Sequence, residues 1–222
     1  MSRQNLSVVS FFGVLFLSSC TLFGGVNPEA LIEPDELEST CEGPTLEMLT
    51  LAEPVDFLAI RRAEENSVQQ GIASVPYWEF TDLETLGIPC SGAQDQEACM
   101  AALADLMPSS TGWGYCGEGC SNSGLVFTRG DEVGMVDSPG EIADFLAEID
   151  TVADVIMVAQ SHEYEADCPT IRLRPDGSYV LGAEILVSDC EVTYEIRQLK
   201  VDPDGALQVL QMLGVRTSRS CY

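Results

Sequence analysis

Histidine and lysine are almost absent from this 222-residue chain, which has one of each, His162 and Lys200. Ten basic side chains stand against 36 acidic ones, which gives a formal net charge of −26 at pH 7. Nucleic acids and anionic lipid surfaces attract proteins through clustered lysine and arginine, which displace counterions. The composition therefore predicts no nucleic-acid partner and no electrostatic attraction to an anionic lipid surface.

The shortage of histidine also limits the chemistry that the chain can perform. A zinc-protease helix needs two histidines four positions apart, and the segment His162-Glu163-Tyr164-Glu165-Ala166 has alanine at the second position. No second histidine exists to complete a catalytic triad, and glycine-rich phosphate or dinucleotide motifs are missing. We therefore expect no metal, no cofactor and no catalytic residue of these types. The many acids leave one enzymatic alternative open, a hydrolase that works through two carboxylates.

No hydrophobic run reaches the roughly 20 residues of a membrane-spanning helix. The apolar stretch from Val8 to Leu17 is about half that length, and Arg3 precedes it in a polar start. A charged start, a short apolar stretch and a small-residue processing site are typical of a secretory signal peptide. A plain signal peptide with an incidental cysteine and an uncut anchor are the alternatives.

The tetrapeptide Leu17-Ser18-Ser19-Cys20 resembles the lipobox of bacterial lipoprotein precursors. The resemblance implies that residues 1–19 are a signal peptide that is removed, and that Cys20 is acylated, as by palmitate. Membrane lipid would then be a partner of the chain. Thr21 stands where an aspartate would favour the inner membrane, so the resemblance implies a lipoprotein of the outer membrane that faces the periplasm or the cell surface.

The other eight cysteines form an even set, which in an exported chain predicts four disulfides. Cys99 falls on the inward face of an expected helix, and Cys90 lies just before that helix, so a local bond between them is expected. The expected pairs are Cys41 with Cys221, Cys90 with Cys99, Cys116 with Cys120, and Cys168 with Cys190.

Residues 20–40 are expected to form an acidic, flexible tether, because they combine glycines and prolines with five acids. A short helix from Asp35 onward is the competing interpretation. Residues 41–222 have the size and the apolar content of a single disulfide-rich domain with a core of its own.

Helix and turn signals are clear in the second half of the chain. Asp95 is a good N-cap for a helix that Pro108 ends, and two further capping signals begin at Ser138 and Thr151. Residues 125–128 and 133–136 are expected to form a hairpin. Alternation over Tyr179–Val187 predicts a long strand, and proline-aspartate-glycine turns at 174–177 and 202–205 predict hairpin connections.

The first part of the domain is harder to interpret. Residues 54–71 fit a helix and a strand about equally well, and residues 112–120 form a glycine-rich segment expected to be a loop. The whole predicts an α+β fold, an antiparallel sheet with a C-terminal meander covered by helices on one face and stapled by disulfides.

Three short features loosely resemble uncharacterised exported proteins of delta-proteobacteria. They are the Thr128–Glu132 turn, the Ile149–Thr151 helix junction and Cys190 after a long strand. This resemblance implies export and no known activity.

Aromatic residues near loop signals are the remaining candidates for a binding site. Trp78, Trp113 and Tyr115 are placed where a ring could stack on a sugar or a peptide, although core packing is the alternative. An anchor, a tether and a stapled domain without a catalytic motif indicate a non-enzymatic module that binds or scaffolds an envelope protein or glycan. The alternative is a carboxylate-dependent hydrolase of envelope glycan or peptide, which would need a cleft with converging acids.

Overall fold

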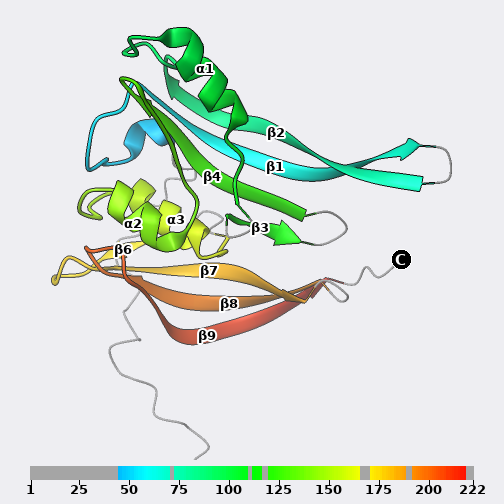
Figure 1. Ribbon diagram of the computed structural model, residues 1–222. Helices are drawn as coiled ribbons and strands as arrows, with labels where there is room; N and C mark the ends of the chain where they lie inside the picture. The colour runs from blue at the N-terminus through cyan, green and yellow to red at the C-terminus, as the bar shows by residue number, and fades with distance from the viewer. Residues whose placement is uncertain are drawn as a thin grey trace, which may run out of the picture. The chain divides into compact units, whose positions relative to one another are not determined.

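The computed structural model describes residues 45–70, 73–109, 112–116, 120–165, 171–188 and 192–218 (Figure 1). The expected signal peptide, Cys20 and the tether lie outside these ranges, as do Cys41, Cys168, Cys190 and Cys221. No helix within these ranges is both long and apolar enough to cross a membrane.

The first sheet is antiparallel and contains a long hairpin. Its strands are β1 (Phe57–Gln70), β2 (Ala73–Gly87), β3 (Trp113–Cys116), β4 (Cys120–Arg129) and β5 (Glu132–Val136). Their order is β2-β1-β4-β3, and β5 pairs with the later part of β4. The expected hairpin of residues 125–136 is confirmed. Residues 57–70, which the sequence left open, form a strand because every one of them has a partner in β2.

Part of the glycine-rich segment is a strand where a loop was expected. Residues 113–116 form β3 and pair with 120–123 of β4. A Cβ at Gly114 would overlap the Ser121 carbonyl group, so glycine lets the two backbones approach closely.

Helix α1 (Gln96–Asp105) begins where the sequence predicted, since the Asp95 side chain accepts a hydrogen bond from the Ala98 N–H at 3.0 Å. A disulfide joins Cys90 to Cys99, with a Cα–Cα distance of 5.9 Å, and confirms the local bond expected from the sequence. Both cysteines are buried. The bond ties the helix to the end of β2.

Helices α2 (Pro139–Phe145) and α3 (Val152–Ser161) both begin with the predicted capping signals. In α2, Ser138 and Glu141 form a capping box, and in α3 Thr151 and Asp154 form the equivalent pair. The two acids differ in burial, because Glu141 is exposed and Asp154 is fully buried. A short 3-10 turn at Leu46–Met48 lies close to α3.

The second sheet contains the expected C-terminal meander. Its strands are β6 (Arg172–Leu173), β7 (Tyr179–Ser188), β8 (Val192–Val201) and β9 (Leu207–Ser218), in the order β6-β7-β8-β9. The turns before β7 and before β9 have glycines with positive φ angles, +83° at Gly177 and +81° at Gly205. These are the turns that the two proline-aspartate-glycine segments predicted.

The helices α2 and α3 lie between the two sheets (Figure 1). One apolar core contains Leu58 of β1, Leu125 of β4, Val158 of α3 and Leu199 of β8, and a smaller cluster is formed by Phe57, Ala59, Leu103 and Val126. Residues 153–159 of α3 are all buried, as expected for a helix with a sheet on each side. The prediction of one sheet covered on one face is therefore corrected. The fold is α+β and rich in antiparallel strands, with two sheets and, among the described cysteines, one disulfide.

Candidate functional site

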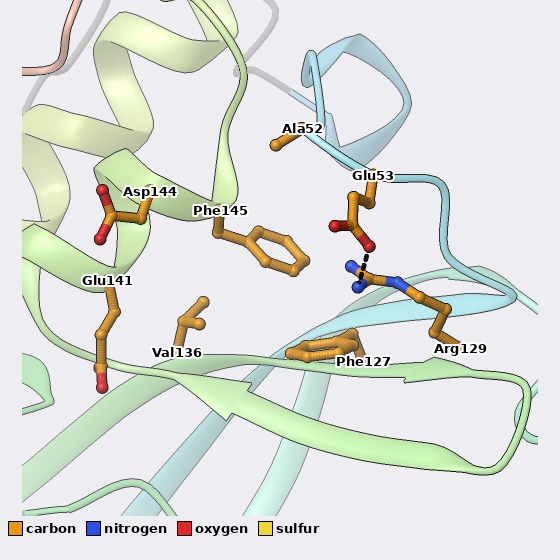
Figure 2. Close-up of a pocket in the computed structure, with 8 residues that line it drawn as sticks. All are labelled: Ala52, Glu53, Phe127, Arg129, Val136, Glu141, Asp144 and Phe145. Carbon is orange, nitrogen blue, oxygen red and sulfur yellow. Dashed lines mark hydrogen bonds and ion pairs between the residues drawn. The ribbon is translucent and has the colours of Figure 1, made fainter.

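A cavity of about 280 Å³ lies beside α2 (Figure 2). Its lining comes from three places, namely the segment before β1, the β4–β5 hairpin and helix α2. The residues are Ala52, Glu53, Phe127, Arg129, Val136, Glu141, Asp144 and Phe145. The Phe127 and Phe145 rings lie 5.0 Å apart between centroids and form an apolar floor.

Among the described residues that line this cavity, Arg129 is the cation, and it is already engaged by its own chain. Arg129 forms an ion pair with Glu53, and its guanidinium lies 5.4 Å from the centre of the Phe127 ring. It also donates to the Pro54 carbonyl oxygen at 3.3 Å and lies 3.5 Å from the Glu132 carboxylate. Binding of an anionic ligand there would have to displace these contacts.

The carboxylates around the cavity do not form a converging pair. In Figure 2 the Glu141 and Asp144 carboxylates point away from the Glu53–Arg129 pair, and all three acids are exposed. Hydrogen bonds from Ser138, whose hydroxyl donates at 2.9 Å, hold the pKa of Glu141 below its ordinary value. A general acid at neutral pH needs a raised pKa, which burial or a neighbouring anion provides. The surroundings of Glu141 favour the opposite, a permanent carboxylate that caps α2.

His162 lies at the end of α3, where its backbone N–H donates to the Ala159 carbonyl oxygen at 3.1 Å. Partial burial lowers the pKa of its imidazole. No three His, Cys, Asp or Glu residues come together in a metal-binding cluster in the part of the chain that the structure describes.

The three aromatic candidates have different surroundings. Trp113 is 9% exposed and packs in the main core, which leaves no ring face free for stacking. Tyr115 lies in β3 opposite Ser121, and its side chain is outside the described part. Trp78 of β2 is 41% exposed and keeps the surface position that ligand stacking requires.

Of the other proposed disulfide partners, only Cys116 and Cys120 have described backbones. They face each other in register at the ends of β3 and β4, while their side chains lie outside the described part. The three remaining proposed bonds stay predictions.

Sequence reasoning did not identify the arm, the part of the β1–β2 hairpin that continues past the first sheet's other strands. The last β1–β4 pair is Glu64 with Ser121, and the arm comprises residues 65–70 and 73–78 beyond it (Figure 1). Tyr77 is 46% and Trp78 41% exposed, and as consecutive strand residues they point to opposite faces. Glu65 is the only charged residue of the arm.

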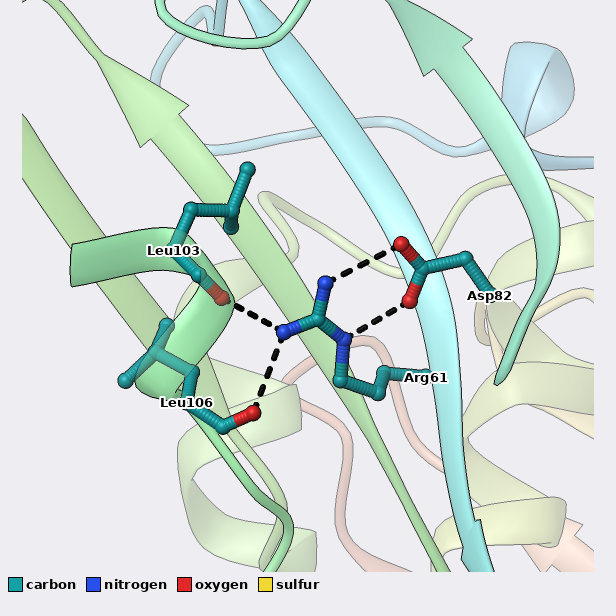
Figure 3. Close-up of polar contacts among 4 residues, drawn as sticks. All are labelled: Arg61, Asp82, Leu103 and Leu106. Carbon is teal, nitrogen blue, oxygen red and sulfur yellow. Dashed lines mark hydrogen bonds and ion pairs between the residues drawn. The ribbon is translucent and has the colours of Figure 1, made fainter. Parts of the chain in front are cut away.

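A buried arginine at the base of the arm was also missed (Figure 3). Arg61 is 3% exposed and forms two hydrogen bonds with the Asp82 carboxylate, at 2.7 and 3.0 Å. It also donates to the carbonyl oxygens of Leu103 and Leu106 at the end of α1, at 2.6 and 3.0 Å. Its guanidinium lies 4.6 Å from the centre of the Phe80 ring. These contacts fasten α1 to both strands of the hairpin and engage four of the five N–H donors of the guanidinium.

Comparison with known proteins identifies no relative: no protein-family model, no curated protein and no solved structure matches this chain.

Proposed function

We propose that this chain is an exported envelope lipoprotein, anchored by lipid on Cys20, whose domain binds or scaffolds another envelope component. The partner is an envelope protein or glycan. The lipobox resemblance and the even set of eight further cysteines support export, and the three disulfides outside the described side chains belong to the same proposal.

The observation that carries the binding role is the arm. A two-stranded hairpin is only marginally stable in water without further strands or a helix to cover it. Beyond Glu64 the arm has lost its β4 neighbour, yet it exposes Tyr77, Trp78 and Val68. Aromatic rings of this kind provide a large apolar contact area with a polar edge, which suits stacking on sugars or peptides.

The composition of the arm supports the same role. Among twelve residues it has one acid, whereas the whole chain has 36 acids in 222 residues. Asn66 and Ser67 accompany the aromatics. Aromatic side chains next to amides and hydroxyls give both stacking and hydrogen bonding, and neither depends on the charge of the partner.

The cavity gives less support to the alternative of a carboxylate hydrolase. Its acids are exposed and point in different directions, and Glu141 is held as an anion by the cap of α2. A retaining or inverting pair needs two carboxyl groups that face one scissile bond.

The test is crosslinking in cells followed by purification of the full chain and mass spectrometry. We expect a defined envelope component with the unaltered chain and with Leu83→Ala, which removes a side chain 50% exposed in β2 outside the arm. With Trp78→Ala the component should be lost. Equal recovery from all three chains would contradict binding through the arm.

The same sample tests the anchor. The amino-terminal peptide should begin at Cys20 and carry the mass of fatty acyl chains. An unmodified start at another residue would contradict lipid anchoring and leave the test of the arm unaffected.

A further inference from the structure

Strand β9 forms one edge of the second sheet, and it lacks the features that usually protect an edge strand from pairing with another chain. Strand β9 has twelve residues and pairs only with β8 among the described strands. An edge strand offers a row of backbone N–H and C=O groups to another strand, and proteins usually protect it with charge, proline or short length. At the opposite edge of this sheet, β6 has only two residues.

Strand β9 has none of these protections in its sequence. It contains no acid, no lysine and no proline, and its one charged residue, Arg216, is held on the chain's own surface. Arg216 forms an ion pair with Glu184 and lies 4.5 Å from the centre of the Tyr194 ring. The edge strand of the first sheet, β2, is different, because it contains Pro76 and three acids, Glu79, Asp82 and Glu84.

Apolar side chains are exposed along β9. The exposed fraction is 48% for Val209, 57% for Met212 and 56% for Val215. These residues pair with Leu199, Arg197 and Glu195 of β8, which are alternate residues and share one face of the sheet. Leu199 is fully buried against the helix layer, so the three exposed side chains continue the core-facing side of the sheet to its edge.

Two extra residues interrupt the pairing with β8. Leu210 and Leu213 fall where the register shifts, and they are 38% and 53% exposed. Bulges are one way to discourage the addition of a further strand. Here both bulges present leucine, which adds apolar surface to the edge.

The sequence of β9 is suited to pairing with a second copy of β9, with Met212 at the centre of the pair. In an antiparallel pair of two β9 strands related by a two-fold axis at this residue, Met212 lies opposite Met212 and Val209 opposite Val215. Directly opposite residues share a face, so the apolar side chains of the two copies would meet on the helix side. Arg216 would lie opposite Gln208, and no two like charges would face each other.

We infer that β9 is a self-association edge, through which two copies of this chain pair antiparallel about Met212 and join their second sheets into one. The interface is isologous, as two-fold interfaces are. The absence of acids from β9 is what lets two chains of net charge −26 approach there. Repulsion between the acids elsewhere on the two chains opposes pairing. Added salt screens this repulsion and should therefore strengthen the dimer.

The inference is independent of the lipid anchor and of the arm, and photo-crosslinking in cells tests it. A photoreactive amino acid at Leu213 of the full chain should give a product of twice the chain mass, in which mass spectrometry finds only this chain. The same amino acid at Leu83, which is 50% exposed in β2, serves as the matched control and should give no such product. Attachment of Leu213 to a different protein, or an equal product from both positions, would overturn the inference.

Sedimentation of the purified full chain provides the second measurement. Met212→Lys places two cations opposite each other at the axis and should weaken the dimer by about tenfold or more, with no change in circular dichroism or melting temperature. Leu83→Lys should leave the dimer unchanged. A monomer at all concentrations and salt levels, or a dimer that Met212→Lys does not weaken, would contradict self-association through β9.

Discussion

The cavity beside α2 and the arm of the first sheet are both open to solvent, but their side chains are engaged in opposite ways. Around the cavity, Arg129 pairs with Glu53, and Glu141 caps a helix. On the arm, Tyr77 and Trp78 are exposed, and no aromatic contact to another described side chain involves their rings. A hollow lined by acids is therefore weaker support for function here than a strand pair with exposed rings.

The largest loss of stability in this comparison should come from a substitution at the base of the arm. We expect Arg61→Ala to lower the free energy of unfolding by about 3 kcal/mol, because it leaves Asp82 and two carbonyl groups without their buried donor. Thermal denaturation should show a fall of roughly 6 to 12 °C.

Arg62→Ala is the matched control, since the neighbouring side chain is 43% exposed and lies 3.9 Å from Glu64. It should change the free energy of unfolding by less than about 0.5 kcal/mol. Equal melting temperatures for the two variants would mean that Arg61 does not fasten α1 to the hairpin.

The two helix-capping acids, Asp154 and Glu141, allow a buried capping carboxylate to be compared with one at the rim of the cavity. Asp154 accepts hydrogen bonds from the Thr50 N–H at 2.9 Å and from the Thr151 N–H and hydroxyl at 3.1 and 2.7 Å. Asp154→Ala leaves these half-buried donors without an acceptor and should cost about 2 kcal/mol in chemical denaturation. Glu141→Ala should cost about 0.5 kcal/mol, because water replaces its contacts. A larger loss from Glu141 would break the comparison.

Much of this local structure could be predicted from the sequence. The caps at Asp95, Ser138 and Thr151, the turns before β7 and β9, and the Cys90–Cys99 bond depend on residues close together in the chain. Strand pairing depends on distant residues, so the residues of β1 could not be assigned to a strand from their pattern alone.

Which side chains are buried was harder to predict from the sequence. Apolar residues on every side of α3 fit burial between two layers, whereas one sheet covered by helices was expected. Trp78 and Trp113 both lie near loop signals, and only the three-dimensional packing places the second ring in the core. In β8 the apolar residues change face, from Val192, Tyr194 and Ile196 to Leu199 and Val201. The structure keeps β8 regular against β7 there and places the extra residues in β9.

The smallest expected effect concerns the charge of Glu141. Because the folded chain lowers the pKa of this carboxyl, its contribution to stability is complete above the ordinary glutamate pKa of about 4.3 and is lost as pH falls through the folded-state pKa. The difference in unfolding free energy between the unaltered chain and Glu141→Gln should therefore be largest at neutral pH and vanish in acid. A difference that grows below pH 4 would contradict the capping role and would fit a protonated carboxylic acid.

Recovery of the crosslinked envelope component from two double variants, compared side by side, tests the central claim most directly. One removes both arm rings, Tyr77→Ala with Trp78→Ala, and the other neutralises two cavity acids, Glu53→Gln with Asp144→Asn. If the arm is the binding site, the first variant loses the component, keeps its melting temperature within about 2 °C, and the second retains it. Loss of the component from the cavity variant with retention by the arm variant would contradict this account.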